Sequence, residues 1–117
     1  PERALALAAG TARAEGARLT VVSVQPIVAD QTAMPPPDYQ PRLDALVARV
    51  ARDHGVEAEG MLKVGGSVSG EIRYAAEELD VDLIVMASHE PRLTDYLIGS
   101  NAAHVALHTP ASVLVVR

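Results

Sequence analysis

Gly99 and Ser100 are the residues whose types and position best suit a chemical task. Residues 83–87 form a short apolar run that predicts a strand buried on both faces, and polar residues 88–94 follow it before Gly99 opens a helical pattern. Unpaired backbone N–H groups at a helix start bind phosphate, and glycine lets a ligand approach the backbone closely. Alternatively, Gly99 only eases a loop into a helix that Ser100 or Asn101 caps. The preceding strand and loop favour the phosphate site.

The sequence gives little support for metal binding or catalysis. His104 and His108 have the i, i+4 spacing of a metal clamp, but no third ligand accompanies them, so we predict no metal site. The chain has no cysteine, which excludes thiolate catalysis and disulfides. It also lacks the phosphate-loop motif of NTPases and the Gly-x-Ser-x-Gly elbow of hydrolases. We therefore predict no catalytic residues, no enzyme activity and, if nucleotide is turned over, slow hydrolysis.

Composition narrows the possible partners. Ten basic against fifteen acidic residues give a net charge of −5, which argues against nucleic acid as a partner. No apolar run approaches the roughly 20 residues of a membrane span, and no signal peptide is visible, so we predict no membrane partner and a cytoplasmic protein. Without Phe or Trp, the core must be built from Val, Leu, Ile and Ala, which favours close packing of helices on a sheet.

Helical and strand patterns alternate along the chain. Apolar stripes predict helices around residues 5–12, 43–50 and 72–79, the last capped by Ser67, and a fourth helix starts at 99. Strands are predicted at 19–24, 57–64, 83–87 and 112–116, and a proline-rich loop at 25–41. The alternation indicates a single α/β domain over 1–117, a doubly wound, Rossmann-like parallel sheet with helices on both faces.

Ala87-Ser88-His89-Glu90, then eight residues, then Gly99-Ser100, and the ending Ser-Val-Leu-Val-Val-Arg resemble the C-terminal half of the universal stress protein family. Ala-Ser-His-Glu-Pro is similar to a branch of that family with a shortened nucleotide loop. The resemblance implies an ATP-binding regulatory protein that acts as a homodimer, with ATP as the cofactor, either alone or together with Mg²⁺. The implied ATP-binding residues are Val24, Ala87, Ser88, His89, Glu90, Arg92, Gly99, Ser100, Asn101 and Ala102.

Glu90 departs from this family pattern. Its carboxylate repels a triphosphate unless a metal ion lies between them, and Pro91 has no N–H to offer. Arg92 could supply the positive charge that the related branch places at position 90, or Glu90 could face away from the ligand. The rival function is therefore a dimeric interaction protein of the same fold that binds no nucleotide. An enzyme of the wider nucleotide-binding superfamily is the least supported reading.

Two further expectations follow from the resemblance. It implies antiparallel pairing of two subunits through Val113, Leu114 and Val115, in an apolar strand that would form a sheet edge. Family members also begin with a central strand before the first helix, whereas this chain begins at that helix. We therefore expect an N-terminally truncated domain with its first, central strand missing, so that strands 19–24 and 82–87 stand one strand apart. Direct pairing of these two strands would contradict the expectation.

Overall fold

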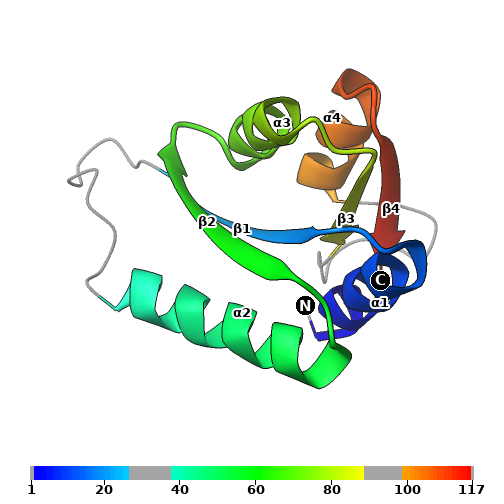
Figure 1. Cartoon of the computed structure of the whole chain (residues 1–117). Coiled ribbons are helices and arrows are strands. Elements are labelled where there is room, and N and C mark those ends of the chain that lie inside the picture. The colour runs from blue at the N-terminus through cyan, green and yellow to red at the C-terminus, as the bar shows by residue number, and fades with distance from the viewer. Residues whose placement is uncertain (1, 27–37, 89–98, 117) are drawn as a thin grey trace.

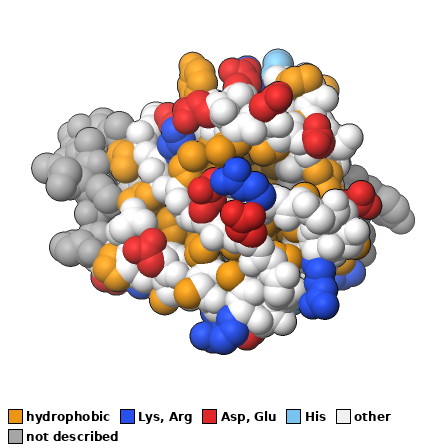
Figure 2. Space-filling view, in the orientation of Figure 1, with side chains coloured by type: hydrophobic (Ala, Val, Ile, Leu, Met, Phe, Trp, Pro, Cys, Tyr) orange, Lys and Arg blue, Asp and Glu red, His pale blue; other side chains and the backbone are white. Residues whose placement is uncertain are grey.

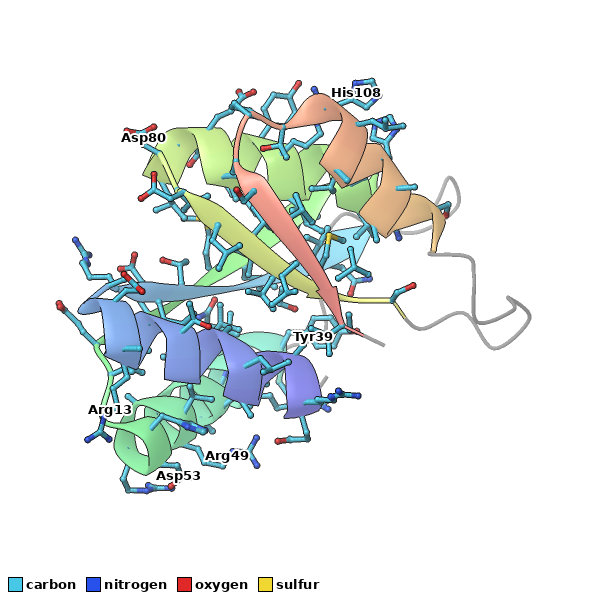
Figure 3. The ribbon with its side chains drawn as sticks, turned by 90° about the vertical axis from the view of Figure 1, so that its right-hand side faces the viewer. Arg13, Tyr39, Arg49, Asp53, Asp80 and His108 are labelled. Carbon is cyan, nitrogen blue, oxygen red and sulfur yellow. The ribbon has the colours of Figure 1, made fainter. Side chains whose placement is uncertain are left out.

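The computed structural model describes residues 2–26, 38–88 and 99–116, which alternate between helix and strand as the sequence predicts (Figure 1). Helices α1 and α2 lie on one side of the strands, and α3 and α4 lie on the other (Figures 1 and 3). The predicted α/β fold with parallel strands and helices on both faces is confirmed. The elements in chain order are α1 (Glu2–Glu15), β1 (Leu19–Pro26), α2 (Tyr39–His54), β2 (Ala58–Gly65), α3 (Val68–Leu79), β3 (Leu83–Ala87), α4 (Ser100–His108) and β4 (Ser112–Val116).

The strands form two separate pairs. β1 runs parallel to β2, from Leu19 opposite Ala58 to Pro26 opposite Gly65. β3 runs parallel to β4, with Ala87 opposite Val116 at the carboxyl end. Among the described residues, no strand pairing joins β1 to β3, so the direct pairing that would have contradicted the expected gap is not observed. That a further strand belongs between them stays a prediction.

The helices bury small side chains against the strands and one another. Among the described residues, no aromatic side chain is buried in this core, and alanine predominates, as the composition indicated. Small side chains let helices approach the strands closely, but each of them buries only a small apolar area. The buried core residues are Ala4, Ala9, Ala12, Leu43, Val50, Ala75, Ala76, Ala102, Val105 and Val116.

Local signals define the helix ends. The Ser67 hydroxyl accepts a hydrogen bond from the Gly70 N–H at 3.1 Å, which confirms the predicted cap of α3. Gly55 ends α2 in the left-handed conformation, with φ of 64°. α3 ends in the same conformation at Asp80, with φ of 51°, where glycine would carry no steric penalty. None of the helices in the described residues is long and apolar enough to cross a membrane.

The prediction that strand 83–87 is buried on both faces is wrong. Its middle residues are only half-buried, and Leu83 keeps 37% of its surface exposed. β1 is likewise half-buried over residues 19–25, and β4 alternates between exposed and covered positions. The reason is a cavity of about 1340 Å³ lined by β1, β3 and the helices that pack on them. Hydrophobic side chains are accordingly visible between charged groups on the face seen in Figure 2.

Candidate functional site

The candidate site begins where β3 ends, and a single serine fixes its geometry. The Ser88 N–H donates to the carbonyl oxygen of Val116 at 2.8 Å, which extends the β3–β4 pairing by one residue. The Ser88 hydroxyl accepts a hydrogen bond from the Gly99 N–H, also at 2.8 Å, in a partly buried position. This pair of bonds holds the amino terminus of α4 beside the carboxyl end of β3, the arrangement that the sequence predicted for a phosphate site.

The first turn of α4 presents backbone donors. Gly99 is the N-cap residue, and no side chain caps the helix, so the alternative in which Ser100 or Asn101 caps it is wrong. The first helical hydrogen bond runs from the Ala103 N–H to the Gly99 carbonyl oxygen at 3.0 Å. The N–H groups of Ser100, Asn101 and Ala102 precede it and have no acceptor among the described residues. Three adjacent N–H groups at a positive helix end suit an anion.

Gly99 is not required by the fold itself. Its φ of −63° is accessible to any residue. A β-carbon placed on Gly99 would meet the Ser88 hydroxyl at 3.5 Å, an ordinary van der Waals contact. The absence of a side chain therefore leaves the helix start open to a ligand without serving the packing.

Val24 and Ala87 line the same cavity, although they belong to different strand pairs. The residue expected to lie beside adenine and the first residue of the predicted phosphate loop therefore border the same cavity, on strands that do not pair with each other. Tyr39 and Arg42 of α2 also line this cavity, and Figure 3 labels Tyr39 near the ends of the strands. The sequence placed Tyr39 within the proline-rich loop predicted at 25–41, whereas the structure begins α2 at this residue.

His89, Glu90 and Arg92 lie outside the described residues, so their predicted roles stay predictions. Among the predicted site residues that are described, the donors are backbone N–H groups, hydroxyls and the Asn101 side-chain amide, without a basic side chain. Lys63 lies opposite Val24 in the β1–β2 register, but its ammonium group is bound to Glu78 at 2.8 Å. Within the described residues, the positive charge nearest to a phosphate at α4 is therefore that of the backbone dipoles at the helix start.

The two histidine rings of α4 lie against each other in a tilted arrangement, with an angle of 47° between their planes. The ring centroids of His104 and His108 lie 4.5 Å apart. Within the described ranges, no group of three or more histidine, cysteine or acidic residues is placed to hold a metal ion. The pair thus has no third ligand in this part of the chain.

The described part of β4 leaves one edge without a strand neighbour, because β3 occupies the other edge. Leu114 is 41% exposed on this strand, whereas Val113 and Val115 are half-buried. An apolar strand edge of this kind favours pairing with another strand.

Comparison with known proteins identifies relatives along the whole chain. A sequence model of the universal stress protein family matches residues 1–117. Universal stress protein G of Salmonella typhimurium and that of Escherichia coli O157:H7 are each 46% identical to this chain over 52 residues, which is 44% of this chain and only 37% of the relative. The chain thus matches well under half the length of these curated relatives.

Solved structures extend the likeness to the full fold. A universal stress protein from Archaeoglobus fulgidus is 27% identical, with a TM-score of 0.78, over 99% of this chain and 83% of that one. A structure of the universal stress protein from Archaeoglobus fulgidus in complex with dAMP is also 27% identical, with a TM-score of 0.76, over 99% of this chain and 86% of that one.

Proposed function

The chain belongs to the universal stress protein family, and we propose that it is an ATP-binding regulatory protein that acts as a homodimer. In this proposal the phosphates lie between residues 87–92 and the first turn of α4, formed by Gly99, Ser100, Asn101 and Ala102. The adenine lies against the backbone of Val24. Mg²⁺ accompanies the triphosphate, and a protein with no assigned catalytic group turns it over slowly or not at all.

One observation carries this proposal: the hydrogen bond from the Gly99 N–H to the Ser88 hydroxyl. It sets an uncapped helix amino terminus at the carboxyl end of a parallel strand, where α/β folds bind anionic ligands. The dAMP complex of the Archaeoglobus fulgidus relative supports an adenine nucleotide as the ligand class.

Calorimetric titration of the chain with ATP and magnesium tests the proposal. We expect saturable binding and a higher melting temperature, since a ligand present at a hundredfold excess over its Kd stabilises the native state by about 2.7 kcal/mol. Gly99→Val should abolish binding because the side chain blocks the approach to the backbone. Gly99→Ala is the matched control: it should fold as the parent does and bind with intermediate affinity. A parent chain that neither binds nor shifts its melting temperature at millimolar ATP and magnesium would sink this proposal.

Glu90 decides between ATP binding and the second candidate function, a dimeric interaction protein without nucleotide. Glu90→Arg should tighten ATP binding if the carboxylate faces the phosphates, and should leave the affinity unchanged if it points away. If the parent does not bind ATP and the Glu90→Arg variant does, the Glu90 carboxylate is what prevents nucleotide binding. That result would support the second candidate function for the parent.

The exposed edge of β4 supports the homodimer. We expect Leu114→Lys to give a monomer, because a charge on an apolar strand edge opposes strand pairing. Sedimentation at micromolar concentration provides the measurement, and Leu107→Lys serves as the control, since Leu107 is 79% exposed on α4 and lies outside the proposed interface. A monomeric parent would contradict the dimer while leaving the nucleotide proposal intact.

The cytoplasmic location expected from the sequence stays a prediction, which cell fractionation can test.

A further inference from the structure

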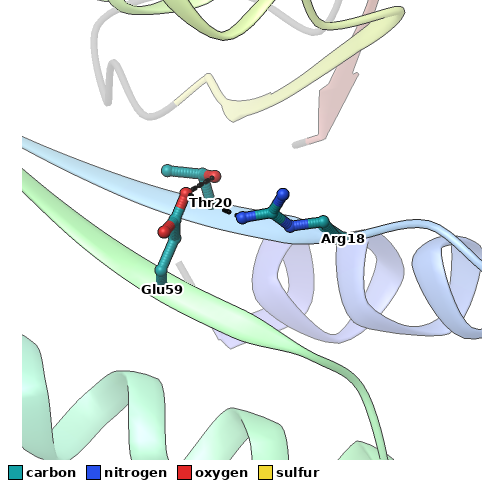
Figure 4. Close-up of polar contacts among 3 residues, drawn as sticks. All are labelled: Arg18, Thr20 and Glu59. Carbon is teal, nitrogen blue, oxygen red and sulfur yellow. Dashed lines mark hydrogen bonds and ion pairs between the residues drawn. The ribbon is translucent and has the colours of Figure 1, made fainter.

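Arg73 on α3 carries a positive charge for which the described residues offer no partner. Its side chain is half-buried, and its Nε atom is buried without a hydrogen-bond acceptor among them. Arg18, by contrast, lies 3.9 Å from the carboxylate of Glu59, which also accepts a hydrogen bond from Thr20 (Figure 4). A buried N–H group without an acceptor destabilises a protein, so the unpaired Nε calls for an explanation.

The two flanks of α3 have different neighbours. Glu78 lies on one flank, where its carboxylate binds the ammonium group of Lys63 on β2 at 2.8 Å. Ser69, Arg73 and Ala76 follow one another at i, i+4 and i+7 and form a stripe along the other flank. Ser69 and Ala76 are buried, and α3 packs against α4 (Figure 1). Arg73 therefore lies on the flank of α3 that faces α4.

The pairing of β3 with β4 sets α3 and α4 at matching heights. Leu83 and Ser112, the first residues of these strands, lie opposite each other, and three residues separate each strand from the helix before it. Arg73 lies six residues before the end of α3, and Ala102 lies six residues before the end of α4. Arg73 is therefore level with the first turn of α4.

The preferred direction of a helical side chain extends Arg73 toward the start of α4. α3 and α4 run in roughly the same direction (Figure 3), and helical side chains point toward the amino terminus of their own helix. Packed helices lie about 8–10 Å apart, so a long arginine side chain on one helix extends across to the next. The Arg73 guanidinium is thereby directed to the N–H groups of Ser100 and Asn101, which have no acceptor among the described residues.

We propose that the Arg73 guanidinium binds a phosphate of the nucleotide, together with the backbone N–H groups of α4. This inference rests on the nucleotide site proposed above, whose predicted residues include no basic side chain within the described ranges. A guanidinium donates two parallel hydrogen bonds to a phosphate, and the phosphate supplies the acceptor that the buried Nε lacks. Arg73 thus recognises the phosphates of the ligand and contributes nothing to the recognition of adenosine.

Packing alone does not account for an arginine at this position. The methylene groups of an arginine pack well against apolar neighbours. A methionine fills similar space without burying an N–H group that lacks an acceptor. A guanidinium at the contact between two helices therefore indicates a role outside packing.

Calorimetric titrations with ATP and with adenosine test this role. Arg73→Gln should raise the Kd for ATP about tenfold, because a charge-assisted contact is lost, and should leave the Kd for adenosine unchanged. Arg73→Lys keeps the charge but not the two parallel donors, so it should regain only part of the affinity. Arg52→Gln is the matched control, since it removes the same charge from α2 on the other side of the strands, and it should bind ATP as the parent does.

Stability in the absence of ligand separates phosphate binding from packing. Arg73→Met should unfold at the same urea concentration as the parent or at a higher one, because it no longer buries an unpaired donor. With ATP present, its unfolding midpoint should rise less than that of the parent. A variant that is less stable without ligand and binds ATP as the parent does would show that Arg73 serves packing.

Inorganic triphosphate distinguishes a failure of this inference from a failure of the nucleotide proposal. If the parent binds triphosphate but not ATP, and Arg73→Gln loses most of that affinity, the phosphate role of Arg73 stands and the nucleotide proposal fails. Equal binding of ATP by the parent and Arg73→Gln would overturn the role of Arg73 and leave the nucleotide proposal intact. A parent that binds neither ligand would refute both.

Discussion

Ser88 ties together three elements through two hydrogen bonds. Its N–H belongs to the β3–β4 ladder, and its hydroxyl holds the start of α4. A serine suits both tasks because a short hydroxyl side chain can accept a backbone hydrogen bond close to its own main chain. The position of the helix donors relative to the strand end therefore depends on one side-chain oxygen.

Ser88→Ala removes this oxygen and leaves the Gly99 N–H without its acceptor. A typical intramolecular hydrogen bond contributes about 1 kcal/mol net, so we expect the free energy of unfolding to fall by about that amount. Ser88→Thr keeps the hydroxyl and should retain most of the stability. Urea unfolding of the three proteins gives the measurement, and equal midpoints for the alanine variant and the parent would show that the bond carries no stability.

The residues of the candidate site could be predicted only in part. The backbone position of Gly99 at a helix start followed from a strand, a loop and a helical pattern in that order. The hydrogen bond between Ser88 and Gly99 could not be predicted in this way, because the pattern of a single sequence does not specify which hydroxyl accepts from which N–H across ten intervening residues. Val24 and Ala87 were named through a family resemblance, and their shared cavity depends on long-range packing that periodicity does not encode.

At the scale of elements, charged contacts join α1 to α2. The carboxylate of Glu2 lies 2.9 Å from the Arg49 guanidinium, and the Arg13 guanidinium donates to the His54 carbonyl oxygen at 3.2 Å (Figure 3). The hydrogen bond from Arg49 and its positive charge lower the pKa of Glu2 below its ordinary value. Both side chains face solvent, so the contact is screened and modest.

This pair predicts a specific acid dependence. A carboxyl group with a lowered pKa in the folded state contributes stability above its unfolded pKa, and this contribution is lost as pH falls through the folded pKa. We therefore expect Arg49→Gln to be slightly less stable than the parent near pH 7, with the difference vanishing below the ordinary glutamate range near 4.3. Glu2→Gln should behave in the same way. Urea midpoints from pH 7 to pH 2.5 provide the check, and a difference that is independent of pH would contradict the assignment.

Two glycines offer a matched test of helix packing. A β-carbon on Gly60 of β2 would lie 3.0 Å from Leu43 Cγ and 3.1 Å from Val47 Cγ2, whereas one on Gly10 of α1 would meet nothing within 4 Å. We expect Gly60→Val to destabilise by about 1–3 kcal/mol, because the side chain pushes α2 off the strand. Gly10→Ala should stabilise by about 0.5–1 kcal/mol through helix propensity. Thermal melts of both variants check the signs, and a stabilising Gly60→Val would show that α2 is free to shift.

The order of the elements could be read from the sequence, but the burial of the strands could not. The periodicity of hydrophobic residues and the residues typical of helix ends located all eight elements of the described structure. Runs such as residues 83–87 are apolar enough for a strand covered on both faces, yet what covers a strand is decided by its neighbours in the sheet and not by its own composition. The half-buried state of β1 and β3 follows from the cavity between the strand pairs.

At the scale of the whole molecule, burial is unevenly distributed between the helices and the strands. Fully buried side chains lie mainly in the helices, whereas β1 and β3 border the cavity. Val105 of α4 is completely buried, and Val22 of β1 is half-buried against the cavity. The same truncation should therefore have different costs at the two positions.

Val105→Ala should lower the free energy of unfolding by about 2–3 kcal/mol, because it removes buried methyl groups and leaves a void in packed surroundings. Val22→Ala should cost about 1 kcal/mol or less in the free chain, since that wall is incompletely covered. Denaturant unfolding of the pair gives the comparison. Equal losses at both positions would mean that the cavity is packed in solution.

The hydrogen bond between Ser88 and Gly99 also has a consequence for how the chain can change in length. It brings together the two ends of a ten-residue segment, residues 89–98, so that segment is a closed loop in the sense of polymer theory. The entropy of closing a flexible loop grows only with the logarithm of its length, so adding four residues costs about 0.3 kcal/mol. Glycine and serine residues inserted after position 92 should therefore leave the fold nearly as stable as before. The number of residues between the strand end and the helix start can thus vary while these two ends stay where they are.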